Sequence, residues 1–314
     1  MLAIPESGFR RSVNEHNCDL VVVCDWIEAS LLSEEVEVSQ SQVADILHEQ
    51  GFYQKPGGNA STFCAEFMEM IWTELHRRES LLGKAAPFKM TGKRILRQGN
   101  WDEFAPTTFL LLLASADYYS VLREKPLNKY IEQGELFEDF CVLSLGGNGW
   151  QTTRTGWASH QGAHKLPKTV AAVAAALDER AVNAAVVELY KHENEAGCDL
   201  VSHWAYPDRW TGRPVVLLQC ASGDNFKKKL GTPSIDDWRK FIGFSTIPLR
   251  GFCTPRTFEN RTFLQHGGKV SGLLLDRFRL LQPFAKTPDL LPADLGQRLL
   301  RWLRPRIKAL PRLK

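Results

Sequence analysis

The stretch Gly197–Gly223, which reads GCDLVSHWAYPDRWTGRPVVLLQCASG, decides the fold predicted for this chain. Residues 198–206 have the composition of a β-strand, and residues 207–213 carry the Pro, Asp and Gly typical of a turn. Residues 214–221 form a continuous run of β-branched and aliphatic side chains, as buried central strands do. Together these segments predict an antiparallel hairpin at the centre of a sheet.

The hairpin predicts a cluster of oxygen ligands. Asp199 stands at the start of its first strand and Gln219 at the end of its second, so antiparallel pairing brings the two side chains together. Glu138, on a helix that precedes the hairpin, can approach the same end of the sheet. Such ligands suit Mg²⁺ or Mn²⁺, hard cations that retain bound water. Each residue also has a structural explanation: Asp199 as a turn cap, Gln219 as a backbone partner and Glu138 as an exposed helix charge.

Around the hairpin, residues 126–284 predict an α/β domain. We expect a helix over residues 134–145, a loop over 147–166 and an Ala-rich helix over 169–193 that is interrupted near Arg180. After the hairpin, Lys227, Lys228 and Lys229 lie on a short helix, and further strands are expected within 244–253 and 270–275.

Residues 1–125 predict an α-helical N-terminal domain. Ser39 or Ser41 can cap an amphipathic helix whose apolar stripe includes Val43 and Leu47, and that helix ends at Gly51. Longer helices are expected over 62–79 and 107–119, and no strand-rich stretch stands out. Residues 285–314 predict a basic C-terminal helix that is broken by Pro305.

The order of these features resembles the PD-(D/E)XK nuclease superfamily. The acidic helix matches at Glu138, the first-strand Asp at Asp199 and the second-strand ligand at Gln219, a Gln that also occurs in Mrr-like members. The resemblance covers residues 134 to about 253 and implies a restriction-endonuclease-like mixed sheet flanked by helices. It further implies a Mg²⁺-dependent DNA endonuclease that works with a partner protein in prokaryotic defence.

The sequence departs from that family at the catalytic lysine, because Ala221 occupies the expected position. In this superfamily the lysine can move to the neighbouring helix, where we favour Lys229 to position the attacking water. If no lysine replaces it, the domain is a non-catalytic nucleic-acid-binding or adaptor subunit. A third interpretation is an unrelated α+β interaction protein, in which Asp199 and Gln219 lie far apart.

Several basic residues are candidates for contact with nucleic acid, and DNA is favoured over RNA. Lys227 and Lys228 flank the candidate site, and Arg154 belongs to the loop predicted over 147–166. The segment Arg298–Lys314 carries seven Lys or Arg and no acidic residue, including Arg301, Arg304 and Arg306. A solvated helix face or a frayed basic end explains the same residues without a ligand.

Composition limits the classes of protein that fit. The net charge is only +3, so no global basic character points to nucleic acid. Seven cysteines without a C-x-x-C pair give neither zinc spacing nor a disulfide framework, which favours buried thiols in a reducing cytosol. The N-terminus lacks signal-peptide character, and the longest apolar stretch is far shorter than the ~20 residues of a membrane span. We therefore expect a soluble cytoplasmic protein that does not bind membranes.

Overall fold

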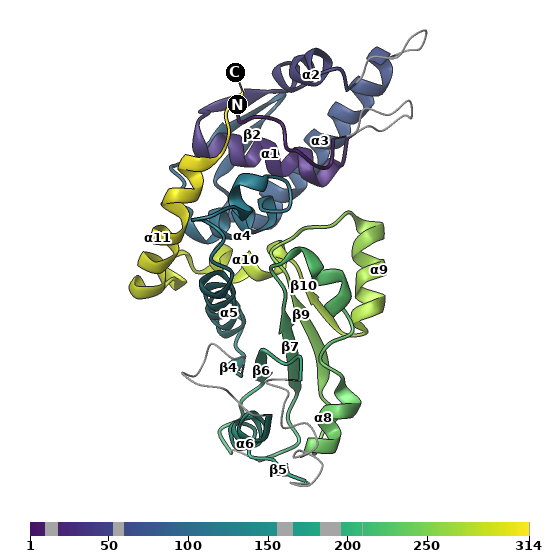
Figure 1. Cartoon of the computed structure of the whole chain (residues 1–314), viewed down its shortest axis with the longest axis vertical. Helices are drawn as coiled ribbons and strands as arrows, with labels where there is room; N and C mark the ends of the chain where they lie inside the picture. The colour runs from purple at the N-terminus through teal and green to yellow at the C-terminus, as the bar shows by residue number, and fades with distance from the viewer. Residues whose placement is uncertain (10–17, 53–59, 156–165, 183–195, 209, 314) are drawn as a thin grey trace. The chain divides into compact units, whose positions relative to one another are not determined.

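The computed structural model describes residues 1–9, 18–52, 60–155, 166–182, 196–208 and 210–313 (Figure 1). Their contacts form two compact units. The first comprises Met1–Lys129 and Phe284–Lys314, and the second comprises Tyr130–Pro283. The division into independently folding domains of residues 1–125, 126–284 and 285–314 stays a prediction.

The second unit is built on a five-stranded sheet. Its strands lie in the order β10-β9-β7-β6-β4. The pairs β4–β6 and β6–β7 are antiparallel, whereas β7–β9 and β9–β10 are parallel. The α/β fold class with a mixed sheet is therefore confirmed. The strand bounds are β4 Gln151–Arg154, β6 Leu200–His203, β7 Val215–Cys220, β9 Leu249–Cys253 and β10 Leu273–Leu275.

The predicted hairpin is present as β6 and β7. Its register pairs Leu200 with Leu218 and His203 with Val215. All of β6 is buried, and β7 is buried up to its last residue, as the apolar run predicted. Both strands are shorter than predicted, and β6 ends at His203, before the exposed Trp204 and Tyr206.

Helices cover both faces of this sheet. The helix α5 (Tyr130–Gly147) contacts β4, β6 and β7 on one face, and α9 (Asn260–Val270) contacts β9 and β10 on the other (Figure 1). The α9 face also carries α6 (Leu166–Ala176) and α8 (Ile235–Phe241), which pack with odd-numbered residues of β7 such as Leu217. Side chains alternate along a strand, so the even-numbered residues of β7 face α5.

Two local predictions in this unit need correction. The loop predicted over 147–166 contains β4, and residues 156–165 lie outside the described chain. The helix predicted over 169–193 ends at Ala176, and Asp178 has a positive φ of 54°. A short strand pair follows, between β5 (Arg180–Ala181) and β8 (Ile242–Gly243), while residues 183–195 lie outside the described chain. The lysine-bearing helix is the 3-10 helix η4 (Asp224–Lys229).

The first unit is mainly helical, as predicted. Ser39 caps α2 by accepting a hydrogen bond from the Gln42 N–H at 3.1 Å, and Val43 and Leu47 form its buried stripe. The unit also contains an unpredicted antiparallel sheet in the order β1-β3-β2, whose strands of three or four residues are too short to show periodicity. Its main elements are α1 Leu20–Ser33, β1 Glu37–Ser39, α2 Gln40–Glu49, α3 Ala60–Leu82, η1 Gly83–Ala85, β2 Phe88–Thr91, β3 Arg94–Arg97, α4 Ala105–Ser115 and η2 Ser120–Arg123.

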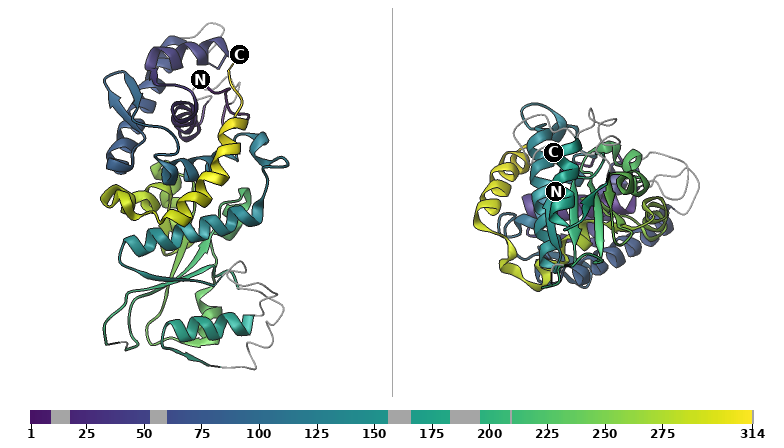
Figure 2. Two further views of the ribbon diagram at one scale, coloured as in Figure 1. Left: turned by 90° about the vertical axis from the view of Figure 1, so that its left-hand side faces the viewer. Right: turned by 90° about the horizontal axis from the view of Figure 1, so that it is seen from below.

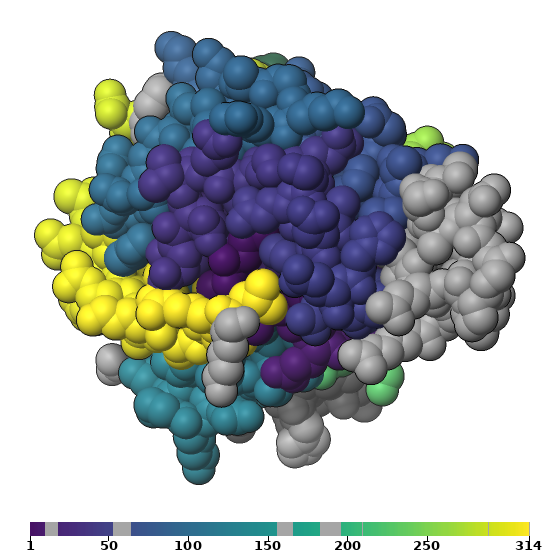
Figure 3. Space-filling view, turned by 90° about the horizontal axis from the view of Figure 1, so that it is seen from above, coloured from purple at the N-terminus to yellow at the C-terminus, as the bar shows by residue number. Residues whose placement is uncertain are grey.

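The C-terminal segment packs on the first unit. After α10 (Arg277–Lys286) and η5 (Pro288–Leu290), α11 (Ala293–Ala309) continues through Pro305 instead of breaking there. An isolated β-bridge joins Leu2 to Arg312, so the two termini lie side by side (Figure 2). In Figure 3 the yellow C-terminal segment accordingly lies against the purple N-terminal elements.

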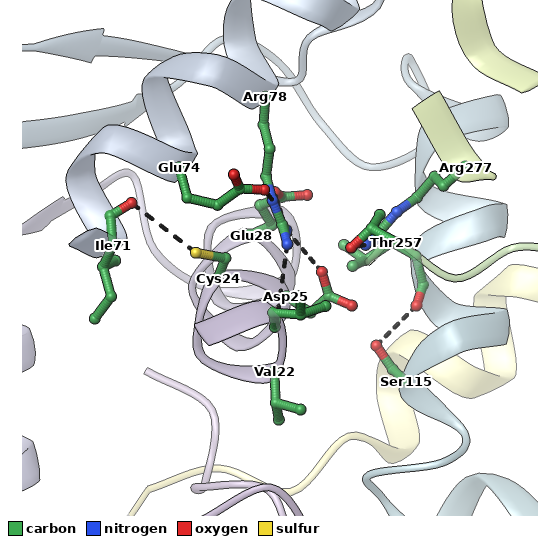
Figure 4. Close-up of polar contacts among 12 residues, drawn as sticks. Val22, Cys24, Asp25, Glu28, Ile71, Glu74, Arg78, Ser115, Thr257 and Arg277 are labelled. Carbon is green, nitrogen blue, oxygen red and sulfur yellow. Dashed lines mark hydrogen bonds and ion pairs between the residues drawn. The ribbon is translucent and has the colours of Figure 1, made fainter. Parts of the chain in front are cut away.

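A buried charge cluster joins α1 to α3 in the first unit (Figure 4). The fully buried Arg78 donates hydrogen bonds to Asp25 and Glu28, both at 2.7 Å, and to Glu74 at 2.9 Å. Asp25 and Glu28 are themselves 1% and 2% exposed. Burial of an unpaired carboxylate carries a large free-energy cost, and the Arg78 guanidinium offsets this cost for Asp25 and Glu28 between the helices.

Candidate functional site

Asp199 and Gln219 meet where β6 begins and β7 ends. The Gln219 Nε2 and the backbone N–H of Cys220 both donate to Oδ2 of Asp199, the latter at 2.6 Å. Asp199 and Gln219 are each 5% exposed. The register of the hairpin requires this proximity, because pairing of Leu200 with Leu218 places residues 199 and 219 opposite each other. The buried carboxylate is therefore held by two N–H donors.

The amide of Gln219 has a defined orientation. Its Nε2 also donates to the carbonyl of Cys220 at 3.1 Å, and two acceptors on one side identify that atom as the nitrogen. Its Oε1 lies 3.2 Å from Oγ1 of Thr232. The amide oxygen thus faces Thr232 and not Asp199. Asp199 supplies the carboxylate of this pair, and Gln219 would join a shared ion only after its amide turns.

The end of η4 lies beside this pair. The Thr232 hydroxyl is 2.7 Å from the carbonyl of Lys229, and the Thr232 N–H donates to the same carbonyl at 2.9 Å. Thr232 therefore links the backbone of Lys229 to the side chain of Gln219. Lys229 is half-buried, whereas Lys227 and Lys228 are exposed. These hydrogen bonds place the backbone of Lys229 beside the pair, and the catalytic role of its ammonium stays a prediction.

Ala221, which occupies the family's lysine position, belongs to an apolar cluster. It is 3% exposed and packs with Phe226, Leu230 and Phe252. A lysine here would begin among these apolar side chains, and burial of an unpaired ammonium carries a large free-energy cost. The packing of this strand end therefore suits alanine.

Glu138 lies on α5 and forms an ion pair with Arg154. The Arg154 guanidinium lies 3.1 Å from Glu138 and 2.5 Å from Asp139. Arg154 stands opposite Leu200 in the β4–β6 pairing, so it reaches α5 from the edge strand. Its side chain is only 18% exposed and is occupied by two carboxylates, so the structure does not present Arg154 as an open phosphate contact.

Glu138 and Gln219 approach the end of the sheet from different faces. Gln219 packs beside Thr232 on the α9 face, and the next residue, Cys220, faces α5. Glu138 is 6% exposed and shares the sheet-facing side of α5 with Cys141, three residues later. An ion that binds both Glu138 and Asp199 would therefore lie beyond the end of β7, between the two faces.

Three thiols whose proximity the sequence does not predict lie together in the second unit. The Sγ atoms of Cys141 (α5), Cys220 (β7) and Cys253 (β9) all lie within 4.8 Å of one another. Burial raises the pKa values of Cys141 and Cys220 well above the usual range, while hydrogen bonds from these two lower the pKa of Cys253 to about 5. Sequence separations of 79 and 33 residues hide the group, and only the pairing of β7 with β9 under α5 creates it.

The predicted basic residues of α11 have different environments. Arg301 and Arg304 are exposed. Arg306 is only 4% exposed, its guanidinium lies 3.8 Å from the ring centroid of Trp302, and it donates hydrogen bonds to the carbonyls of Trp302 and Leu127. Arg306 is thus a packing residue of the first unit, which corrects its prediction as a phosphate contact.

No helix within the described ranges combines the length and the apolar character that crossing a membrane requires. Comparison with protein families gives no match, and no curated protein matches the sequence. A solved structure of the restriction endonuclease FokI bound to DNA matches with a TM-score of 0.20 and 11% identity, covering 88% of this chain and 47% of that one. The chain thus spans about half the length of that endonuclease chain. A similarity this low supports no conclusion about fold or function.

Proposed function

We propose that the second unit is a metal-dependent nuclease that hydrolyses phosphodiester bonds in DNA. The observation that carries this proposal is the contact between Asp199 and Gln219 at adjacent ends of β6 and β7, with the backbone of Lys229 linked to Gln219 through Thr232. An acidic helix, a first-strand Asp and a second-strand Gln occur there in the order of the PD-(D/E)XK pattern. Glu138, Asp199 and Gln219 would hold Mg²⁺ or Mn²⁺.

The chemistry assigned to each side chain follows from its position. A bound Mg²⁺ would lower the pKa of a coordinated water and neutralise charge on the phosphate. Asp199 accepts two N–H hydrogen bonds, which fix its carboxylate at the end of the sheet. The Lys229 ammonium would hold the attacking water in line with the phosphorus. Hydrolysis then breaks one P–O bond as the water oxygen forms another, and the leaving oxygen takes up a proton.

The exposed lysines beside the site would contact the DNA backbone. Lys227 and Lys228 stand on η4 next to Lys229 and are open to solvent. On the first unit, Arg301 and Arg304 offer a second basic surface. In keeping with the family resemblance, the first unit would recruit a partner protein in a prokaryotic defence complex.

One observation favours a second function, that of a non-catalytic nucleic-acid-binding or adaptor subunit. The nitrogen of the Gln219 amide, not its oxygen, faces Asp199, and Ala221 fills the lysine position with apolar packing. An amide that satisfies a buried carboxylate is a stable arrangement without any ion. In this case the unit binds DNA but does not cleave it.

Cleavage of supercoiled plasmid in Mg²⁺ or Mn²⁺ tests the nuclease proposal. We expect the wild-type chain to nick DNA, and Asp199→Asn and Lys229→Met to lose at least a hundredfold in rate. Lys269→Met is the matched control, because it removes an exposed lysine of α9 to which the proposal gives no role, and it should retain most of the rate. Equal nicking by wild type, Asp199→Asn and Lys229→Met would overturn the site assignment.

Binding of the same DNA at several salt concentrations separates the two functions. A phosphate-binding surface predicts that log K falls with log[salt] and that Arg301→Ser/Arg304→Ser flattens the slope by about 1–2. Salt-dependent binding by a wild-type chain that cleaves nothing with either metal would support the adaptor. An unchanged slope in the double variant would remove α11 from the proposed DNA surface.

A further inference from the structure

We propose that Cys141, Cys220 and Cys253 form a binding site for one soft, thiolate-seeking metal ion, Cu⁺ or Zn²⁺. The site differs from the proposed Mg²⁺ site in its ligands, which are sulfur atoms, although Cys141 and Cys220 lie close in sequence to Glu138 and Gln219. It does not depend on nuclease activity.

Three elements of the second unit build this site. The register of the parallel pair β7–β9 places Cys220 beside Cys253 at the carboxyl ends of both strands. The helix α5 contributes Cys141 from above that strand end, and it contacts β7 directly. Cys141 and Cys253 are each 0% exposed, so two of the three sulfurs are held in packed backbone elements. A rigid scaffold of this kind favours a defined coordination geometry.

The distances between the sulfurs suit one shared ion. Thiolates bound to a single zinc at ~2.3 Å lie about 4 Å apart, and the three Sγ atoms already lie within 4.8 Å of one another. Small χ1 adjustments therefore suffice to close the site. On binding, each thiol that joins the ion releases its proton to solvent.

The ligand set selects the class of metal. Sulfur ligands favour soft ions such as Cu⁺ and Zn²⁺ over Mg²⁺ or Ca²⁺, which prefer oxygen. Among the described residues, this group of possible metal ligands consists of Cys141, Cys220 and Cys253, each of which supplies one sulfur atom. Cu⁺ can be bound by three sulfur ligands alone, whereas Zn²⁺ would require a fourth ligand with a nitrogen or oxygen donor atom.

An ion at this position would also brace the candidate catalytic end of the sheet. The N–H of Cys220 donates to Asp199, so fixing the sulfur of Cys220 fixes the strand end that orients that carboxylate. The soft ion would act here by positioning and would take no part in hydrolysis.

The full-length chain, prepared reduced and free of metal, is titrated with Zn²⁺ and in parallel with Cu⁺ held in a competing chelator. We expect one ion per chain after desalting, with three sulfur neighbours by X-ray absorption. Cys220→Ser should weaken binding at least tenfold. Cys64→Ser, a buried cysteine of the first unit, is the matched control and should bind like wild type. Asp199→Asn should also retain the ion, which separates this site from the proposed nuclease.

The wild-type titration alone can refute the proposal, so the test does not depend on variants that fold poorly. Retention of neither ion, or a bound ion without sulfur neighbours, would overturn it. A disulfide between Cys220 and Cys253 in chain isolated without reductant, together with no metal uptake after reduction, would likewise overturn it. Three sulfurs with Cu⁺, or three sulfurs and one light atom with Zn²⁺, would support the site and identify the ion.

Discussion

Substitution of Arg78 by Met should strongly destabilise the first unit. Arg78 is 0% exposed and is hydrogen-bonded to Asp25, Glu28 and Glu74. Met keeps much of the volume but removes the guanidinium that donates hydrogen bonds to Asp25 and Glu28 (Figure 4). Removing one partner of a buried ion pair costs about 3–5 kcal/mol, because the remaining charges stay buried. This is a large share of a typical unfolding free energy of about 5–15 kcal/mol.

The neighbouring Arg77 offers a matched control. It also pairs with Glu74, at 2.7 Å, but its side chain is 47% exposed. Pairs in contact with solvent contribute about 0–1 kcal/mol, so Arg77→Met should have a small effect. The combined variant Arg78→Met/Asp25→Asn/Glu28→Gln should recover much of the loss, because it removes the two fully buried charges along with their partner.

Amide hydrogen exchange measured by mass spectrometry follows the change within the first unit. Since 1.4 kcal/mol is a factor of ten, 3–5 kcal/mol predicts exchange about a hundredfold to a few thousandfold faster in α1 and α3. Arg77→Met should accelerate amide exchange in α1 and α3 by less than about tenfold. If Arg78→Met and Arg77→Met exchange at the same rate in Leu20–Ser33, the cluster does not stabilise these helices and the reasoning fails.

Two further predictions concern the second unit. Burial lowers the pKa of His203 below 6.5, and nearby Arg213 lowers it further, so the fold favours the neutral imidazole. The stabilisation that comes from the neutral imidazole is complete above pH 6.5 and is lost as pH falls through the folded pKa. The urea midpoint should therefore drop between pH 7 and pH 5, and it should drop less in His203→Gln. Equal drops in the two proteins would show that His203 does not cause the loss. A Cβ on Gly272 would lie 2.1 Å from the carbonyl oxygen of Arg250, so Gly272→Ala should destabilise by about 1–3 kcal/mol in urea unfolding. Gly268 lies inside α9, and a Cβ there would have no neighbouring atom within 4 Å, so Gly268→Ala should instead stabilise the fold by up to about 1 kcal/mol. Equal effects of the two substitutions would contradict this packing.

Helix caps, apolar periodicity and turn residues were sufficient to predict much of the fold from the sequence. The cap at Ser39 and the stripe of Val43 and Leu47 set α2, because both depend on neighbours within two helical turns. The apolar run of β7 and the turn before it predicted the hairpin, since adjacent strands joined by a short turn pair by default. The contact between Asp199 and Gln219 followed from that register alone.

Features that join distant segments were decided only by tertiary structure. β4 became an edge strand because β6 offered a free side, although its own sequence resembles a loop. Arg154 and Arg306 look alike as basic residues, yet one pairs with Glu138 and the other packs on Trp302, because burial depends on which elements cover them.

Short-range periodicity and register thus sufficed to predict the helices α2, α3 and α5, the central hairpin and the meeting of Asp199 with Gln219. Tertiary structure decided the orientation of the Gln219 amide and the face from which Glu138 approaches. It also decided that Cys220 and Cys253 stand together under Cys141. The physical reason is that packing a helix across parallel strands joins residues whose separation along the chain carries no periodic signal.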